Sequence, residues 1–101
     1  MQAGPADRSC EPSGGLDSLL GREVVMDSAG PMVYLGRLAS SDADGFWLED
    51  ADVHNGSEGH APREQYIAES ARDGIRINRR RVFVFRHTVI SASALKDALT
   101  D

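Results

Sequence analysis

Two stretches decide the fold: GREVVMDSAGPMVYLGRLASSDADGFWLEDA at residues 21–51 and RRRVFVFRHTVISAS at residues 79–93. Both contain short runs of β-branched, aliphatic and aromatic residues, which are typical of strands, separated by turns rich in Gly, Pro and Asp. The first stretch predicts strands at 23–27, 32–40 and 46–50, and the second predicts strands at 79–87 and 88–91. The pattern predicts a mostly β fold, a small SH3-like five-stranded antiparallel barrel.

Two features constrain how these strands pack. Gly36 lies inside a strand, where glycine usually marks a bend, a bulge or a close backbone approach. The strand at 79–87 carries apolar residues on both alternating faces, so we expect it to be buried on both sides. One side would face the barrel interior. The other side needs a partner, for which a neighbouring copy of the chain is the simplest candidate.

The remaining segments are weaker in pattern. Residues 1–15 are rich in Gly, Pro and Ser and predict a flexible tail, which leaves 16–101 as a single domain. A short helix is expected at 16–20, and a helical end piece at 92–99. A long polar insert at 52–74 separates the third and fourth strands, with a short helix predicted at 63–73 between Pro62 and Gly74.

Composition excludes several classes of protein. The formal net charge of −5 argues against a general nucleic-acid coat. Five of the eleven basic residues nevertheless lie between Arg76 and Arg86, and six of the sixteen acids lie between Asp42 and Glu58. The single cysteine, Cys10, makes no internal disulfide, and no secretory signal or membrane-spanning run is present. These features favour a cytoplasmic protein with no membrane contact.

The two stretches resemble, in order, the two halves of the signature of the Sm-like family, and a divergent member of bacterial or phage type is expected. The first motif of the family is matched at Gly21, Gly30, Tyr34-Leu35-Gly36-Arg37-Leu38, Asp42 and Leu48-Glu49-Asp50-Ala51. The second is matched at Val84-Phe85-Arg86-His87, followed by Val89-Ile90. The resemblance covers roughly half of the chain.

The resemblance implies a ring of about five to seven subunits, in which the fourth strand of one copy pairs with the fifth strand of the next. Ring closure protects strand edges that would otherwise aggregate. The interface residues that follow from this arrangement are Val82, Phe83, Val84, Phe85, Val89 and Ile90.

The resemblance also implies single-stranded RNA as a partner, bound near the centre of the ring. Asp42 and Arg86 match the family's binding pocket. The position of its Asn falls on Gly45, and its stacking position falls on Ala43 or Asp44. Its second-motif Gly is replaced by His87, which would either contact a base or block the pocket. Stacking and hydrogen bonding to base edges are the general means of recognising single strands.

Other interpretations remain open for the same residues. Arg86 and Asp42 would also form an ordinary salt bridge, and Arg79 and Arg80 are either contacts for phosphates or the solvated start of a strand. The histidines have no metal-ligand spacing, and neither a metal nor a cofactor is expected. No nucleophile motif or phosphate loop indicates an enzyme. The alternative function is an oligomeric scaffold without RNA, which binds proteins through the insert at 52–74.

Overall fold

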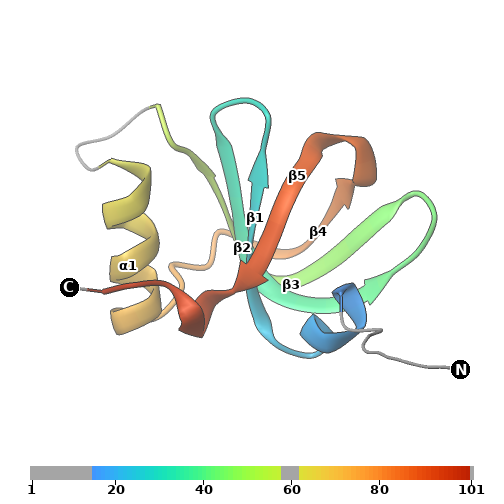
Figure 1. The fold of residues 1–101 in the computed structure, drawn as a ribbon, viewed down its shortest axis with the longest axis horizontal. Helices are drawn as coiled ribbons and strands as arrows, with labels where there is room; N and C mark the ends of the chain where they lie inside the picture. Colours follow the sequence, from blue (N-terminus) through green and yellow to red (C-terminus); the bar gives the residue numbers. More distant parts are fainter. Residues whose placement is uncertain (1–14, 58–61, 101) are drawn as a thin grey trace, which may run out of the picture.

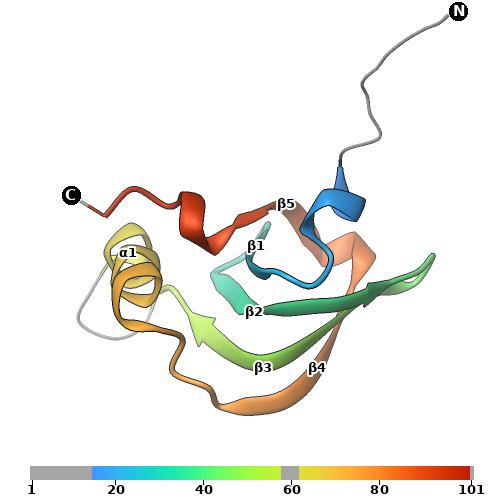
Figure 2. The same ribbon diagram turned by 90° about the horizontal axis from the view of Figure 1, so that it is seen from below.

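The computed structural model describes residues 15–57 and 62–100 of the chain. Five strands form one antiparallel sheet in the order β4-β3-β2-β1-β5 (Figure 1), which confirms the prediction of a mostly β fold with five antiparallel strands. The sheet curls strongly (Figure 2). Because β4 and β5 lie at its two edges and do not pair with each other, the sheet is open. The tail predicted for 1–15 lies outside the described residues, apart from Gly15.

The strands are β1 (Glu23–Ser28), β2 (Met32–Ser41), β3 (Gly45–Asn55), β4 (Arg79–Phe85) and β5 (Val89–Ala94). One α-helix, α1 (Arg63–Asp73), connects β3 to β4 and matches the helix predicted there. Short 3-10 turns occupy Leu16–Leu19, Arg86–Thr88 and Leu95–Asp97. The predicted helices at both ends of the domain are therefore reduced to single turns. At the C-terminal end the backbone instead pairs with β1 as far as Ala94, which faces Val24.

Strand β3 is longer than predicted. It continues past Asp50 to Asn55, which pairs with Met32 at the start of β2, so the first residues of the predicted insert belong to the sheet. The strand bends at Asp50, whose φ is +49°. Opposite this bend, a Cβ on Gly36 would lie 3.1 Å from the Cβ of Ala51, so the glycine allows the close approach predicted for it.

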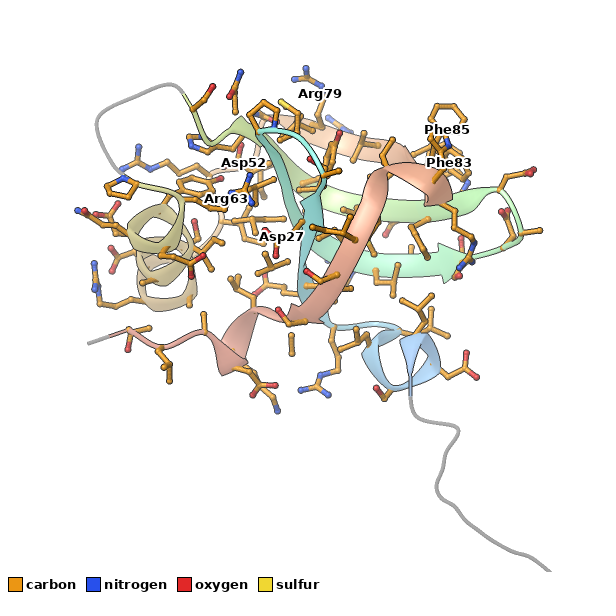
Figure 3. All side chains as sticks on the ribbon, turned by 45° about the horizontal axis from the view of Figure 1, so that its top comes forward. Asp27, Asp52, Arg63, Arg79, Phe83 and Phe85 are labelled. Carbon is orange, nitrogen blue, oxygen red and sulfur yellow. The ribbon has the colours of Figure 1, made fainter. Side chains whose placement is uncertain are left out.

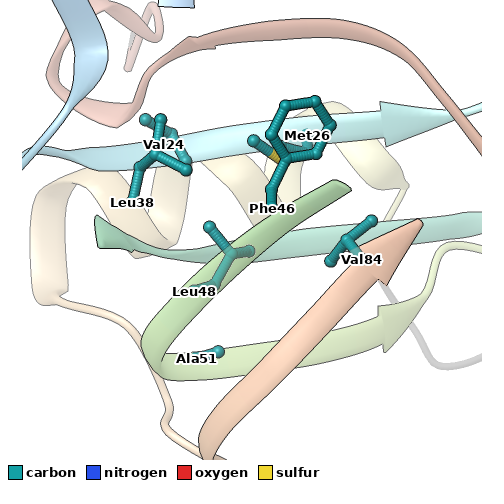
Figure 4. Packing of buried hydrophobic residues seen from close by; sticks show 7 residues of the cluster. All are labelled: Val24, Met26, Leu38, Phe46, Leu48, Ala51 and Val84. Atoms are coloured by element: carbon teal, nitrogen blue, oxygen red, sulfur yellow. The ribbon is translucent and has the colours of Figure 1, made fainter. Parts of the chain in front are cut away.

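The main core fills the concave side of the curled sheet (Figure 4). Side chains from four strands meet there, each at most 3% exposed: Val24, Met26, Leu38, Phe46, Leu48, Ala51 and Val84. Because strand side chains alternate between the two faces, the neighbours of these residues project from the convex side. The apolar side chains among them need packing partners on the convex side, outside the main core.

Helix α1 supplies those contacts over part of the convex side. Its buried Ile67, together with Leu95, packs on the residues of β1 and β2 that face outward: Val25, Val33 and Leu35. Arg63 fixes the start of the helix to the β1–β2 turn (Figure 3), with Nη1 3.4 Å from Asp27 Oδ1 and Nη2 donating to the carbonyl of Gly30 at 3.1 Å. The insert is therefore part of the packed domain.

A buried polar network also joins the first turn of α1 to the sheet. Asp52, only 5% exposed, accepts hydrogen bonds from the Tyr66 hydroxyl and, at 2.8 Å, from the Asn78 amide. The Asn78 side chain also accepts from the backbone N–H of Val53 and donates to its carbonyl. Because Asn78 immediately precedes β4, this network sets where β4 begins against β3.

Burial, and then the hydrogen bond to Asp52, raises the pKa of Tyr66 well above its usual range. Tyr66 thus keeps its proton in the folded chain where the unfolded chain loses it, above about pH 10. The free energy of unfolding should therefore fall as the pH rises through that range. We expect Tyr66→Phe to lose about 1 kcal/mol at pH 8 through the missing hydrogen bond. It should show a weaker alkaline dependence than the unsubstituted chain.

Urea denaturation at neutral and alkaline pH measures both effects. Tyr34→Phe is the matched control, because it removes the other tyrosine of the chain and leaves the Asp52 network intact. Equal alkaline dependence in the unsubstituted chain and in Tyr66→Phe would contradict the role given to this hydroxyl.

Candidate nucleic-acid interface

Two turns lie side by side at one end of the sheet, one between β2 and β3 and the other between β4 and β5. In the first turn, Asp42 Oδ1 accepts hydrogen bonds from the backbone N–H groups of Asp44 at 2.8 Å and Gly45 at 3.1 Å. This arrangement is a side-chain-capped turn of the kind that aspartate favours. The Asp42 carboxylate thus shapes its own loop.

Arg86 joins the second turn to the first. Its Nε donates to the backbone carbonyl of Asp42 at 3.2 Å, and its Nη2 donates to the same carbonyl and to Ser41 Oγ at 3.1 Å. The guanidinium lies over the Phe46 ring, 4.7 Å from its centroid. The predicted partnership of Arg86 with Asp42 therefore exists, but through the main chain, and no ion pair links the two side chains in the described part of the chain.

Gly45 explains why this pocket lacks the asparagine expected from the Sm-like motif. A Cβ at this position would lie 2.2 Å from the Val84 carbonyl oxygen and 2.9 Å from the Phe83 ring. Because β3 and β4 approach so closely here, no side chain fits without separating the strands. Any ligand at this turn must therefore be bound by neighbouring groups and not by a side chain at position 45.

Those groups surround an open hollow of about 520 Å³. Both turns and the end of β4 line it: Ala43, Asp44, Phe83, Phe85, Arg86 and His87. Phe85 is 57% exposed, and its ring centroid lies 6.1 Å from that of His87. The structure thus brings Arg86 and His87 together beside the Asp42 turn, with an exposed aromatic ring as their neighbour.

Phe83 and Phe85 were predicted only as interface residues, so their place in this hollow was missed. The signal was nevertheless present, since alternation along a strand places both rings on the same face as Arg79 and Arg81. Arg79 and Arg80 lie at the opposite end of β4, about 20 Å from Phe85 at strand spacing. They do not line the hollow.

The predicted interface residues fall into three groups. Val84 belongs to the core of its own chain at 3% exposure, so its side chain does not form a surface. Val82, Phe83 and Val89 are half-buried, while Phe85 and Ile90 are 57% and 66% exposed. In the described chain only the core-facing side of β4 is covered, so burial of its other side by a neighbouring copy stays a prediction.

Neither a metal site nor a membrane-spanning helix is found among the described residues. No group of three or more His, Cys, Asp or Glu side chains at 15–57 and 62–100 could hold a metal ion. Within the same residues, no helix is long and apolar enough to cross a membrane.

Comparison with known proteins finds similarity among solved structures. No family model matches the chain, and no curated protein matches it. Among solved structures, the chain is similar to the Sm protein of Pyrococcus abyssii, solved in complex with a uridine heptamer. The two share 18% sequence identity, and the match covers 79% of this chain and 96% of that chain with a TM-score of 0.54. The five strands described above are thus arranged as in an Sm protein, and the chain has an Sm-like fold.

Proposed function

We propose that the protein is an RNA-binding, ring-forming member of the Sm-like family, with its RNA site in the hollow between the 42–45 and 86–88 turns. The observation that carries this proposal is the contact of Arg86 with the Asp42 turn. It holds a cation beside the exposed rings of Phe85 and His87. The similar Sm protein was solved with a uridine heptamer, which supports RNA as the ligand class.

The chemistry of the hollow suits a single-stranded nucleotide. Arg86 uses Nε and Nη2 to hold the turn, while Nη1 donates to no acceptor among the described residues and remains free for a base edge or phosphate. The exposed rings of Phe85 and His87 offer stacking surfaces, and stacking tolerates different bases because every base has a π-face. His87 thus takes the place of the missing glycine as a contact.

The open sheet supports assembly into a ring. Strands β4 and β5 present the two unpaired edges, and they are of similar length, 7 and 6 residues. Pairing β4 of one copy with β5 of the next would satisfy the backbone groups of both edges. The exposed Ile90 of β5 would then be covered by the neighbouring copy.

Native mass spectrometry of the full chain, with and without short oligouridine at low salt, tests the proposal. We expect a ring of about five to seven copies that gains the mass of RNA. Arg86→Ala should weaken binding by roughly tenfold, because it removes both the cation and the tie between the turns. His87→Ala should weaken binding without changing the mass of the ring. A monomer would overturn the proposed ring. A ring with no affinity for RNA would overturn the proposed RNA site.

A scaffold without RNA is the second candidate, favoured by the net charge of −5 and by the absence of any side chain at position 45. Because the apolar face of α1 packs on its own sheet, only the polar face of the insert is left for a partner. Deleting the insert would therefore unfold part of the domain. Glu64→Ala with Arg72→Ala tests it better, since both residues are exposed. A ring without RNA affinity that loses a co-purified protein on this change would favour the scaffold.

A further inference from the structure

The convex side of β4 carries a regular row of cations and aromatic rings. Alternation places Arg79, Arg81, Phe83 and Phe85 on this side, opposite the core residue Val84. Figure 3 shows Phe83 and Phe85 together at one end of β4 and Arg79 toward the other. Trp47, on the adjacent strand, stands beside the row. We call these residues the outer β4 strip: Trp47, Arg79, Arg81, Phe83 and Phe85.

The rings of the strip are in contact with one another. The ring centroids of Trp47 and Phe83 are 5.1 Å apart, and those of Phe83 and Phe85 are 5.4 Å apart, both edge to face. The guanidinium of Arg81 lies 4.2 Å from the centroid of Trp47 and continues the row. The strip is therefore one continuous surface of rings and cations along β4.

This surface is not covered in the described chain, in contrast to the part of the convex side on β1 and β2. Helix α1 packs on β1 and β2, where it buries Val25 and Leu35, but it does not reach the β4 strip. Phe85 remains 57% exposed. Pairing of the β4 edge with another copy would use backbone groups, and it would place the added strand beside the row of side chains rather than over it.

The arginines and aromatic rings of the strip suit a polyanion that also carries planar groups able to stack. Two arginines and three aromatic rings face one carboxylate, Glu49, whose Oε2 lies 3.8 Å from Arg81 Nε. The chain as a whole is acidic, with a net charge of −5, so the two arginines of the strip contrast with the overall charge. A cationic track with aromatic platforms is the usual design for binding single-stranded nucleic acid without base specificity.

The strip also adjoins the proposed site, since Phe83 and Phe85 line the same hollow as Arg86 and His87. We propose that the outer β4 strip is a stacking track for the nucleotides that flank the one held in the hollow. Bases stack on Phe85 and Phe83, and the phosphates reach Arg81 and Arg79. The row extends about 20 Å from Phe85 to Arg79, which is enough for several nucleotides. This inference rests on the proposed function of the hollow.

Fluorescence anisotropy with labelled oligouridines of about three and about ten nucleotides tests the track with the full-length chain. The test variant combines Phe83→Leu with Phe85→Leu, which removes the rings but keeps apolar side chains. It should bind the longer RNA roughly tenfold more weakly and bind the shorter RNA with a smaller loss. The longer RNA should also quench the fluorescence of Trp47, the single tryptophan of the chain. Leu99→Ala, at an 87% exposed site, is the matched control and should change neither value.

The outcomes separate the track from the Arg86 contact of the hollow. Equal binding of the longer RNA by the Leu variant and the unsubstituted chain, with Arg86→Ala still weakened, would overturn the track and leave that contact in place. Weakening by the Leu variant but not by Arg86→Ala would keep the rings as a binding surface and overturn the Arg86 contact. A smaller native mass of the Leu variant would assign Phe83 and Phe85 to subunit contact, against the track. Failure of the unsubstituted chain to bind any RNA would overturn both.

Discussion

Gly45→Asn is expected to lower the free energy of unfolding by about 3 kcal/mol, although asparagine is the residue that the Sm-like motif places there. The new Cβ would lie 2.2 Å from the carbonyl oxygen of Val84. This oxygen belongs to the backbone of β4, so it can retreat only if the pairing of Gly45 with Phe85 is broken. Urea denaturation, followed by the fluorescence of Trp47, measures the loss.

Gly30→Asn is the matched control. Gly30 lies in the β1–β2 turn and does not have a positive φ, and a Cβ added to it would meet only Ser28 Oγ, at 4.0 Å. The same substitution should therefore change stability by at most about 0.5 kcal/mol. If Gly45→Asn unfolded at the same urea concentration as this control, the close approach of β3 and β4 at the hollow would be refuted.

Ile67→Asp is expected to destabilise the domain by about 4 kcal/mol, since it places an unpaired carboxylate in an apolar cluster. Ile67 is only 7% exposed and packs with Val25, Leu35 and Leu95. The loss approaches the whole stability of an ordinary small domain, about 5–15 kcal/mol. Urea denaturation gives its size. Hydrogen exchange shows whether α1 leaves the sheet first.

Gln65→Asp adds the same charge on the exposed side of the same helix and should cost about 0.5 kcal/mol, partly through repulsion of Glu69 one turn away. Similar losses in the two variants would mean that α1 does not pack on the sheet, and that the insert is not part of the packed domain.

The strands were predictable because their signals are local. Alternating and β-branched runs, the Ser28–Pro31 turn and the glycine at position 36 each specify a structure within a few residues. The helix at 63–73 could be predicted for the same reason, from Pro62 and Gly74 at its ends. These local signals do not indicate which outward-facing side chains are covered in the folded domain.

The rest depended on contacts between distant residues. The second cluster joins Ile67 to Val25 and Leu35, which read as ordinary strand residues until the helix is placed on them. Strand β3 continues beyond Asp50 only because the strand bends there. The residues after the bend resemble a loop in sequence, so the continuation was not predicted. At the candidate site, Asp42 and Arg86 were identified by motif, but their mode of contact was not. Residue types do not reveal that the Asp42 carboxylate accepts hydrogen bonds from its own loop. Nor do they reveal that the Arg86 guanidinium donates to the backbone carbonyl of Asp42.

The pairing of β1 with β5 affects when the molecule becomes able to assemble. Strands β1, β2 and β3 are consecutive and joined by short turns, so they form from local contacts during synthesis. Strand β5 pairs with β1 only after a loop that contains most of the domain has closed, as in the pairing of Val24 with Ala94. For a ring that joins β4 of one copy to β5 of the next, an unfinished chain lacks one of the two edges. The ring proposed above would therefore close only from chains in which β5 is complete.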